Sequence, residues 1–273
     1  PARKAIRLEK SLPKRERSKN MKIKEIIAEI ERVAPLDTAL PYDNPGLIVG
    51  DDEKECTGVL LTVDATYGAL KEAENNGCNL IISHHPIIFT PRKSFLTKDY
   101  KCDVIASAYV SGTAIYAAHT NIDGFHDNMA VRTLKAIGAK NVTTLFDNGF
   151  GAQGDVDMKF SEIKEKVKKL LCDDTIFTVG DENKKIKKVA MINGAGGDDK
   201  CFSRAREVGA DLYISGEFKH HILLEAKETN YALMSVGHYA SEMCFNDVLN
   251  DILQCHFDTI NIVKYYEGNP FNG

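Results

Sequence analysis

The sequence predicts an α/β (α+β) protein built from two similar halves that are related by a pseudo-twofold axis. Short apolar runs that suit buried strands alternate with segments of helical periodicity, which is the pattern of repeated strand–helix–strand units. One stretch also recurs, because Gly77–Ser83 and Gly209–Ser215 both begin with glycine, continue to an apolar triplet and end with serine. Duplication of one unit within the chain accounts for both observations.

The length and composition limit the number of domains and the kind of protein that the chain can form. The chain has 273 residues, 43% of them hydrophobic, which is enough for one large or two moderate domains. No apolar run approaches the ~20 residues that cross a bilayer, and no signal-peptide pattern is present, so we expect a cytoplasmic protein without a membrane partner. Seven scattered cysteines without a Cys-x-x-Cys pair indicate reduced thiols.

The first twenty residues differ in charge from the rest of the chain. Residues 1–20 carry eight basic and two acidic side chains, which leaves a net charge of about −10 for residues 21–273. A basic arm can bind nucleic acid, but the acidic remainder does not favour that partner. We expect residues 1–20 to be a disordered or non-native extension, and residues 21–273 to form a single two-lobed unit. Lobe 1 should span about residues 21–130 plus the C-terminal segment, and lobe 2 about residues 131–250.

The helices and strands of the first half are predicted from the spacing of apolar residues and from the glycines that end helices. Isoleucines at 23, 26, 27 and 30 recur at helical spacing, and Gly77 is placed to end the helix before it. Together these signals predict helices over residues 23–33, 66–76, 103–111 and 127–137, and strands over residues 47–49, 58–63, 79–82 and 114–118.

The second half repeats the alternation. We expect turns over residues 147–149 and 151–154, because Asn-Gly and clustered glycines favour them. The predicted helices cover residues 161–171 and 199–208, and the predicted strands cover residues 188–192, 209–215 and 234–238. In this alignment Ile115–His119 corresponds to Met234–His238.

Histidines and carboxylates gather at the predicted strand ends. His84 and His85 follow a buried strand directly, and two imidazoles at a strand end can converge on one point. His119 is followed four residues later by Asp123 and His238 four residues later by Glu242, so each half contributes one pair. The carboxyl ends of strands are where α/β sheets place their sites.

This set of residues suits a metal centre. Imidazoles mixed with carboxylates favour Zn, Fe, Mn, Co or Ni, and five or six such ligands exceed the needs of one tetrahedral ion. They fit two divalent ions with a bridging carboxylate, which would activate a water molecule at neutral pH. The sequence has no Ser-His-Asp elbow, Walker loop or dinucleotide fingerprint. The glycine-rich run 194–197 predicts either a tight turn or a phosphate cradle.

Three segments carry a family resemblance: Ser83–Phe89, Ala118–Asp123 and Gly237–Glu242. They resemble the dinuclear-metal-centre hexamer family, also called NGG-one-interacting-factor-three-like, whose members are often named type-two GTP cyclohydrolase homologues. The resemblance covers residues 21–271, and it implies two α/β halves per subunit and a toroidal homohexamer with a two-metal centre facing its cavity. It implies the metal ligands His84, His85, Asp123, His238 and Glu242, with Glu242 as the bridge.

The resemblance has two departures. Tyr42 stands where many members have tryptophan, and Ala152 stands where many have an arginine. If that arginine meets a substrate phosphate in relatives, nucleotide binding would differ here.

The function that we expect is a dinuclear metal-dependent hydrolase, similar to type-two GTP cyclohydrolase, that acts on a small nucleotide-like substrate. His119 would be its catalytic proton carrier. The alternatives are a metal-storage or metal-insertion protein without turnover and a ring-shaped factor that binds nucleic acid or protein. His220 and His221 could line the cavity or lie on the surface at a helix start.

Overall fold

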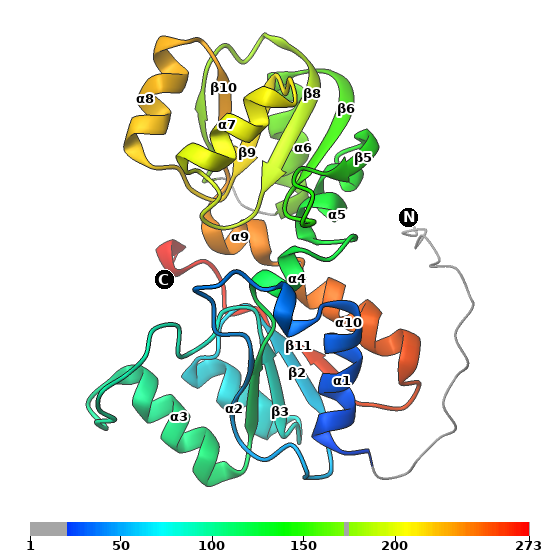
Figure 1. The fold of residues 1–273 in the computed structure, drawn as a ribbon, viewed down its shortest axis with the longest axis vertical. Coiled ribbons are helices and arrows are strands. Elements are labelled where there is room, and N and C mark those ends of the chain that lie inside the picture. Colours follow the sequence, from blue (N-terminus) through cyan, green and yellow to red (C-terminus); the bar gives the residue numbers. More distant parts are fainter. Residues whose placement is uncertain (1–20, 172–174, 273) are drawn as a thin grey trace.

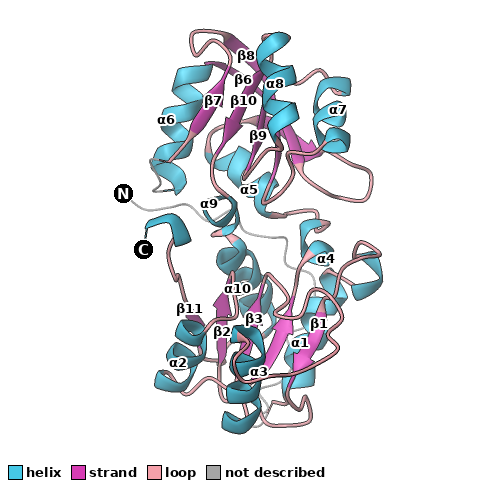
Figure 2. Ribbon diagram, turned by 90° about the vertical axis from the view of Figure 1, so that its left-hand side faces the viewer, coloured by secondary structure: helices cyan, strands magenta, loops and turns pink. Residues whose placement is uncertain are grey.

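In this computed structural model, residues 21–171 and 175–272 are described, so the expectation for residues 1–20 falls outside the described residues. The described chain is a mixed α/β protein with one sheet in each of two lobes (Figures 1 and 2). The predicted α/β class is therefore confirmed, whereas the pseudo-twofold relation remains a prediction. Among the described residues, no helix has both the length and the apolar character needed to span a bilayer.

The sheet of the first lobe has parallel strands at its centre. Its described strands lie in the order β1 (Gly46–Val49), β4 (Ala114–Ala117), β3 (Leu80–Ser83), β2 (Val59–Thr62) and β11 (Ile262–Lys264). Strands β2, β3, β4 and β11 run parallel, and β1 runs antiparallel to β4. Thr62, Ser83 and Ala117 are level with one another at the carboxyl end of the sheet.

The sheet of the second lobe repeats this central arrangement. Its described strands lie in the order β5 (Lys140–Thr144), β6 (Ala152–Lys159), β8 (Lys185–Ile192), β9 (Leu212–Ser215), β10 (Ala232–Ser235) and β7 (Phe177–Val179). Strands β8, β9 and β10 run parallel, and β7 runs antiparallel to β10. Ile192, Ser215 and Ser235 are level here, as their counterparts are in the first sheet.

The register corrects one detail of the predicted correspondence between the halves. Ser83 and Ser215 do occupy matching places, but Ala117 is level with the first serine and Ser235 with the second. His119 therefore corresponds to Gly237, and not to His238. Both residues precede a short helix, α4 (Thr120–Asp123) in the first half and α9 (His238–Glu242) in the second. His119 therefore precedes α4, whereas His238 is the first residue of α9.

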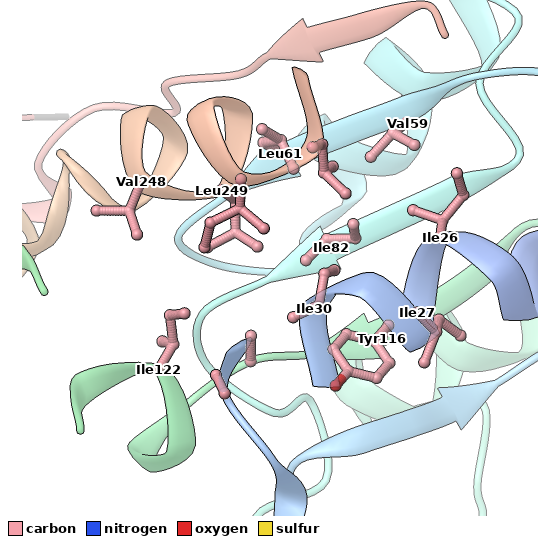
Figure 3. Packing of buried hydrophobic residues seen from close by; sticks show 14 of the residues in the cluster. Ile26, Ile27, Ile30, Val59, Leu61, Ile82, Tyr116, Ile122, Val248 and Leu249 are labelled. Atoms are coloured by element: carbon pink, nitrogen blue, oxygen red, sulfur yellow. The ribbon is translucent and has the colours of Figure 1, made fainter. Parts of the chain in front are cut away.

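Helices cover both faces of the first sheet. Helices α1 (Ile23–Val33) and α10 (Phe245–His256) pack on one face, where Figure 3 shows isoleucines of α1 against β2 and β3. Helices α2 (Tyr67–Asn75) and α3 (Tyr100–Ser111) pack on the other face. Successive side chains of a strand point to opposite faces of the sheet, so Leu61 packs in the core beneath α1 and Leu60 in the core beneath α2. Burying each isoleucine of α1 contributes about 1.5–3 kcal/mol.

The second sheet is covered in the same way. Helices α5 (Met129–Ala136) and α6 (Phe160–Leu171) pack on one face, and α7 (Asp199–Glu207) and α8 (His220–Glu228) pack on the other. Two short 3₁₀ turns, η1 (Leu36–Thr38) and η2 (Pro270–Asn272), complete the described elements. Each sheet is thus a buried middle layer, and the carboxyl ends of its parallel strands are left to build a site.

The structure differs from the predicted elements at several places. Strand β6 begins at Ala152, where a turn was expected, because the chain has already reversed over residues 146–150. The N–H of Gly149 donates to the carbonyl oxygen of Phe146 there, and both Gly149 and Gly151 have a positive φ. The sequence pattern also missed β5, β7, β11 and α10, and it offered the start of α8 at His220 only as one of two alternatives. Helix α10 packs in the core of the first lobe, so residues 245–250, expected in lobe 2, lie in lobe 1.

Candidate metal centre

The two adjacent histidines follow strand β3 directly. His84 is buried, and its Nδ1 lies 2.9 Å from the carbonyl oxygen of Ala118. Because a carbonyl oxygen only accepts, Nδ1 donates and Nε2 is the nitrogen left to face the site. His85 has an acidic partner instead, since its Nδ1 lies 2.9 Å from Oδ1 of Asp64. The turn after Ser83 brings the two rings together, with 5.0 Å between their centroids.

Two further histidines are held in the same way. Nδ1 of His119 lies 2.7 Å from Oδ1 of Asp43, and Nδ1 of His238 lies 3.1 Å from Oε1 of Glu217. The rings of His85 and His119 are 5.5 Å apart, and those of His85 and His238 are 5.2 Å apart. In all four histidines one ring nitrogen is thus held by an oxygen, which is how proteins orient imidazoles that bind metals.

Glu242 lies at the centre of this group. Its Oε1 is 3.3 Å from Nε2 of His238 and 3.5 Å from Nε2 of His84. Its Oε2 is 3.2 Å from Nε2 of His85. Asp123 approaches from the other lobe, with Oδ1 3.8 Å from Nε2 of His84. The structure therefore brings together all six residues that the sequence singled out.

One part of that prediction was wrong. Asp123 and Glu242 do not lie at strand ends, because each is the last residue of a short helix, α4 or α9. These helices lie where the two lobes meet (Figure 1). One helical turn after each strand carries the carboxylate back over the carboxyl end of its sheet.

The donor set fits transition-metal ions. Nε2 of His84 and Oε2 of Glu242 are buried and have no hydrogen-bond partner of acceptable geometry. Buried polar atoms are normally paired, so two unpaired ligand atoms on neighbouring residues point to an ion. Ligand atoms within 4.8 Å of one another form two groups of three, which are His84, His85 and His119 in one and His85, His238 and Glu242 in the other. Imidazole and carboxylate donors suit divalent Zn, Fe, Mn, Co or Ni.

The histidines and carboxylates of the site shift one another's pKa values. Burial lowers the pKa of His85, but the hydrogen bond with Asp64 and the nearby carboxylate of Glu242 raise this pKa to about 10. Burial likewise lowers the pKa of His238, but Glu242 raises it to about 9. Burial raises the pKa of Glu242, yet the charge of His84 and the hydrogen bond with His238 hold it well below its usual range. A buried carboxylate that stays ionised in this way is a strong ligand for a cation.

Asp43 supports His119 by the same principle. Its carboxylate is buried, and it accepts hydrogen bonds from His119, from the backbone N–H of Thr120 at 2.9 Å and from the Thr120 hydroxyl. Burial by itself raises the pKa of Asp43, but these donors hold it well below its usual range. The carboxylate therefore stays ionised and keeps the proton of His119 on Nδ1.

A cleft of about 660 Å³ opens onto the candidate ligands. The ring of Phe89 lies 5.9 Å from that of His119, and the ring of Tyr42 lies 6.2 Å from that of Phe89. The remaining lining includes two more aromatic side chains and two cations, namely Phe146, Phe150, Lys101 and Lys200. Room for a small molecule beside the ligands is typical of catalytic metal sites, whereas structural sites are closed.

The sequence reasoning missed the residues that orient the histidines. Asp43, Asp64 and Glu217 had been given no role, although Asp64 directly follows the strand predicted over residues 58–63. His220 and His221 were left open. Both are exposed at the start of α8, His221 pairs with Asp199 at 2.9 Å, and neither belongs to the described lining of the cleft. This favours the surface interpretation.

Comparisons with known proteins point to one family. A sequence model of the Duf34/NIF3 (NGG1p interacting factor 3) family matches residues 21–270. A Clostridium perfringens protein named GTP cyclohydrolase 1 type 2 homolog is 32% identical over 230 residues, which cover 81% of this chain and 87% of the relative. A Methanocaldococcus jannaschii protein of the same name is 30% identical over 239 residues, covering 87% of this chain and 97% of the relative.

The fold also matches a solved structure. A Bacillus cereus protein described as related to NIF3 superposes with a TM-score of 0.87 over 93% of this chain and 99% of that one, and its 22% identity makes this a likeness of fold. Together with the family match, it agrees with the resemblance that the three histidine segments indicated. The chain therefore belongs to the Duf34/NIF3 family.

Proposed function

We propose that this protein is a dinuclear metal-dependent hydrolase that acts on a small, nucleotide-like substrate. One observation carries the proposal: an ionised, buried Glu242 lies within 3.5 Å of three inward-facing imidazole nitrogens beside a cleft of about 660 Å³. GTP is the first candidate substrate, because related proteins bear the name GTP cyclohydrolase 1 type 2 homolog.

Five residues would hold the two ions. Glu242 would be the bridge, because its Oε1 faces His84 and His238 whereas its Oε2 faces His85. The other proposed ligands are His84, His85, Asp123 and His238. Two such ions supply Lewis acidity and a water that is activated at neutral pH.

The remaining side chains would position the substrate and move a proton. With its Nδ1 held by Asp43, His119 offers Nε2 as the atom that accepts or returns a proton at the cleft. The same ring lies within ligand reach of His84 and His85, so a role as an additional ligand is a second possibility for it. Phe89 and Tyr42 narrow the cleft beside it and would exclude water from one side of a bound substrate.

The test combines metal analysis with a substrate screen. Protein purified without chelators is analysed for metals and assayed with GTP, other nucleotides and simple phosphoesters, with Glu242→Gln as the inactive control. Turnover that requires metal and is lost in the variant supports the proposal. A full metal complement without turnover on any substrate would instead favour the metal-storage or metal-insertion alternative, and a protein without metal would refute both.

A further inference from the structure

A glycine, Gly194, lies beside the candidate metal centre just after strand β8. A Cβ atom built on Gly194 would collide with Oε1 of Glu242 and lie 3.1 Å from Nε2 of His238. Real Cβ atoms are essentially never that close to a carboxylate oxygen, so a side chain at this position and the observed position of Glu242 exclude each other.

The backbone at this position cannot easily move away. The N–H of Gly194 donates to Oγ of Ser241 at 2.8 Å, and its carbonyl oxygen accepts from the N–H of Glu217 at 3.1 Å. On the opposite side, a Cβ on Gly216 would lie 2.5 Å from that same carbonyl oxygen. Ser241 also precedes Glu242 directly in α9. The glycine is therefore fixed to the helix that carries the carboxylate and to the loop that carries Glu217.

The matching place in the first lobe has a side chain. Asp64 lies two residues beyond Thr62 in β2, and Gly194 lies two residues beyond Ile192 in β8, at the same level of the two sheets. In the first lobe the carboxylate of Asp64 fills this place and holds Nδ1 of His85. In the second lobe the space is left for Glu242.

We propose that Gly194 is a positioning residue whose missing side chain creates the space in which the Glu242 carboxylate is held among the histidines. A methyl group there displaces the carboxylate and weakens metal binding. The inference rests on the proposed function, because it assigns Gly194 a role in the same metal centre. It also accounts for the glycine at the start of the 194–197 run without a phosphate cradle. The N–H of Gly194 already donates to Ser241 and is not available to a phosphate.

A matched control separates the collision from backbone strain. Gly194 has a φ of +58°, a left-handed conformation in which any substitution is strained. Gly209 has a φ of +73°, but a Cβ built on it meets nothing within 4 Å. Gly194→Ala and Gly209→Ala therefore share the backbone cost, and only the first adds a collision with a proposed ligand.

The experiment is a titration of metal-free protein with Co²⁺, followed by visible absorption and by the number of ions bound per subunit. We expect Gly209→Ala to bind cobalt as the wild type does. Gly194→Ala should bind it about 10–100-fold more weakly and with an altered absorption spectrum, although the thermal midpoints of the two metal-free variants are similar. If Gly194→Ala does not fold, Gly194→Asn and Gly209→Asn repeat the comparison, because asparagine adopts the left-handed conformation more readily.

The outcomes are distinguishable. Two ions in the wild type and an unchanged affinity and spectrum in Gly194→Ala would overturn the inference alone. A wild-type protein that binds no cobalt would overturn the proposed function, and the inference with it. Equal weakening in Gly194→Ala and Gly209→Ala would show that backbone strain, and not the collision, is responsible.

Discussion

Oε2 of Glu242 lies 3.2 Å from Nε2 of His85, although these two residues belong to different lobes. His85 follows a strand of the first sheet, and Glu242 ends a short helix that packs with the second lobe through Ala240. A cation held between them would tie the lobes together. Metal binding is therefore expected to contribute to folding stability as well as to chemistry.

The first prediction concerns metal content. Protein that has never met a chelator should contain about two transition-metal ions per subunit, because the six clustered residues provide more donors than one ion needs. Removing the metal should lower the thermal midpoint, and restoring it should reverse the change. Elemental analysis that finds one ion or none in such protein would contradict the dinuclear assignment.

The second prediction compares two residues of the centre. Glu242→Gln should lose metal toward one ion or less, since the amide keeps the shape of the carboxylate but not the charge that faces both ions. His119→Gln should retain metal and lose at most ~10–100-fold in affinity or activity. Metal analysis of both variants decides between them. Full occupancy in the first variant with metal loss in the second would make His119 the ligand and Glu242 the supporting group.

The third prediction concerns the carboxylate that holds His85. Asp64→Asn should weaken metal binding by about 10–100-fold, because an amide oxygen can still accept from Nδ1 of His85 but lacks the negative charge that raises the basicity of the imidazole. Asp199→Asn is the matched control, since Asp199 also pairs with a histidine at 2.9 Å but does so on the surface. Metal titration of the two variants should differ, and equal affinities would argue against a role for Asp64.

The fourth prediction excludes a thiol nucleophile in the cleft. Cys201 lines the cleft, but burial and the neighbouring Asp198 raise its pKa to about 12. Almost none of it is thiolate at pH 7.5, so iodoacetamide should label exposed Cys255 well before Cys201. Cys201→Ser should keep its metal and any hydrolytic activity. Rapid labelling of Cys201, detected by peptide mass analysis, would contradict this prediction.

The fifth prediction concerns the basic extension. Deleting residues 1–20 should leave the thermal midpoint and the oligomer mass nearly unchanged, since the N–H of Lys22 donates to Glu25 at the start of α1 and the isoleucines of α1 pack in the core of the first lobe. We propose a toroidal homohexamer for this oligomer, which native mass measurement can test. Loss of the assembly on deletion would show that the extension belongs to it.

Much of the candidate site could be predicted because its ligand-type residues are adjacent or only four residues apart in the sequence. His84 and His85 follow an apolar run, and the spacings His119–Asp123 and His238–Glu242 each cover about one helical turn. The supporting residues could not be found in this way. Asp43 lies far from His119 in the sequence, and Glu217 is an exposed glutamate whose contact with His238 exists only after the second lobe has folded.

The sequence by itself determined the α/β class, the central strands and helices and the six candidate site residues, because periodicity and ligand type are local properties. Tertiary structure decided what those residues face. It placed Glu242 beside histidines of the other lobe. It also placed His238 one residue later, relative to its strand, than His119, and it put Gly194 where the carboxylate of Glu242 needs space. These relationships depend on how two sheets pack end to end, and no short stretch of sequence encodes the distance between them.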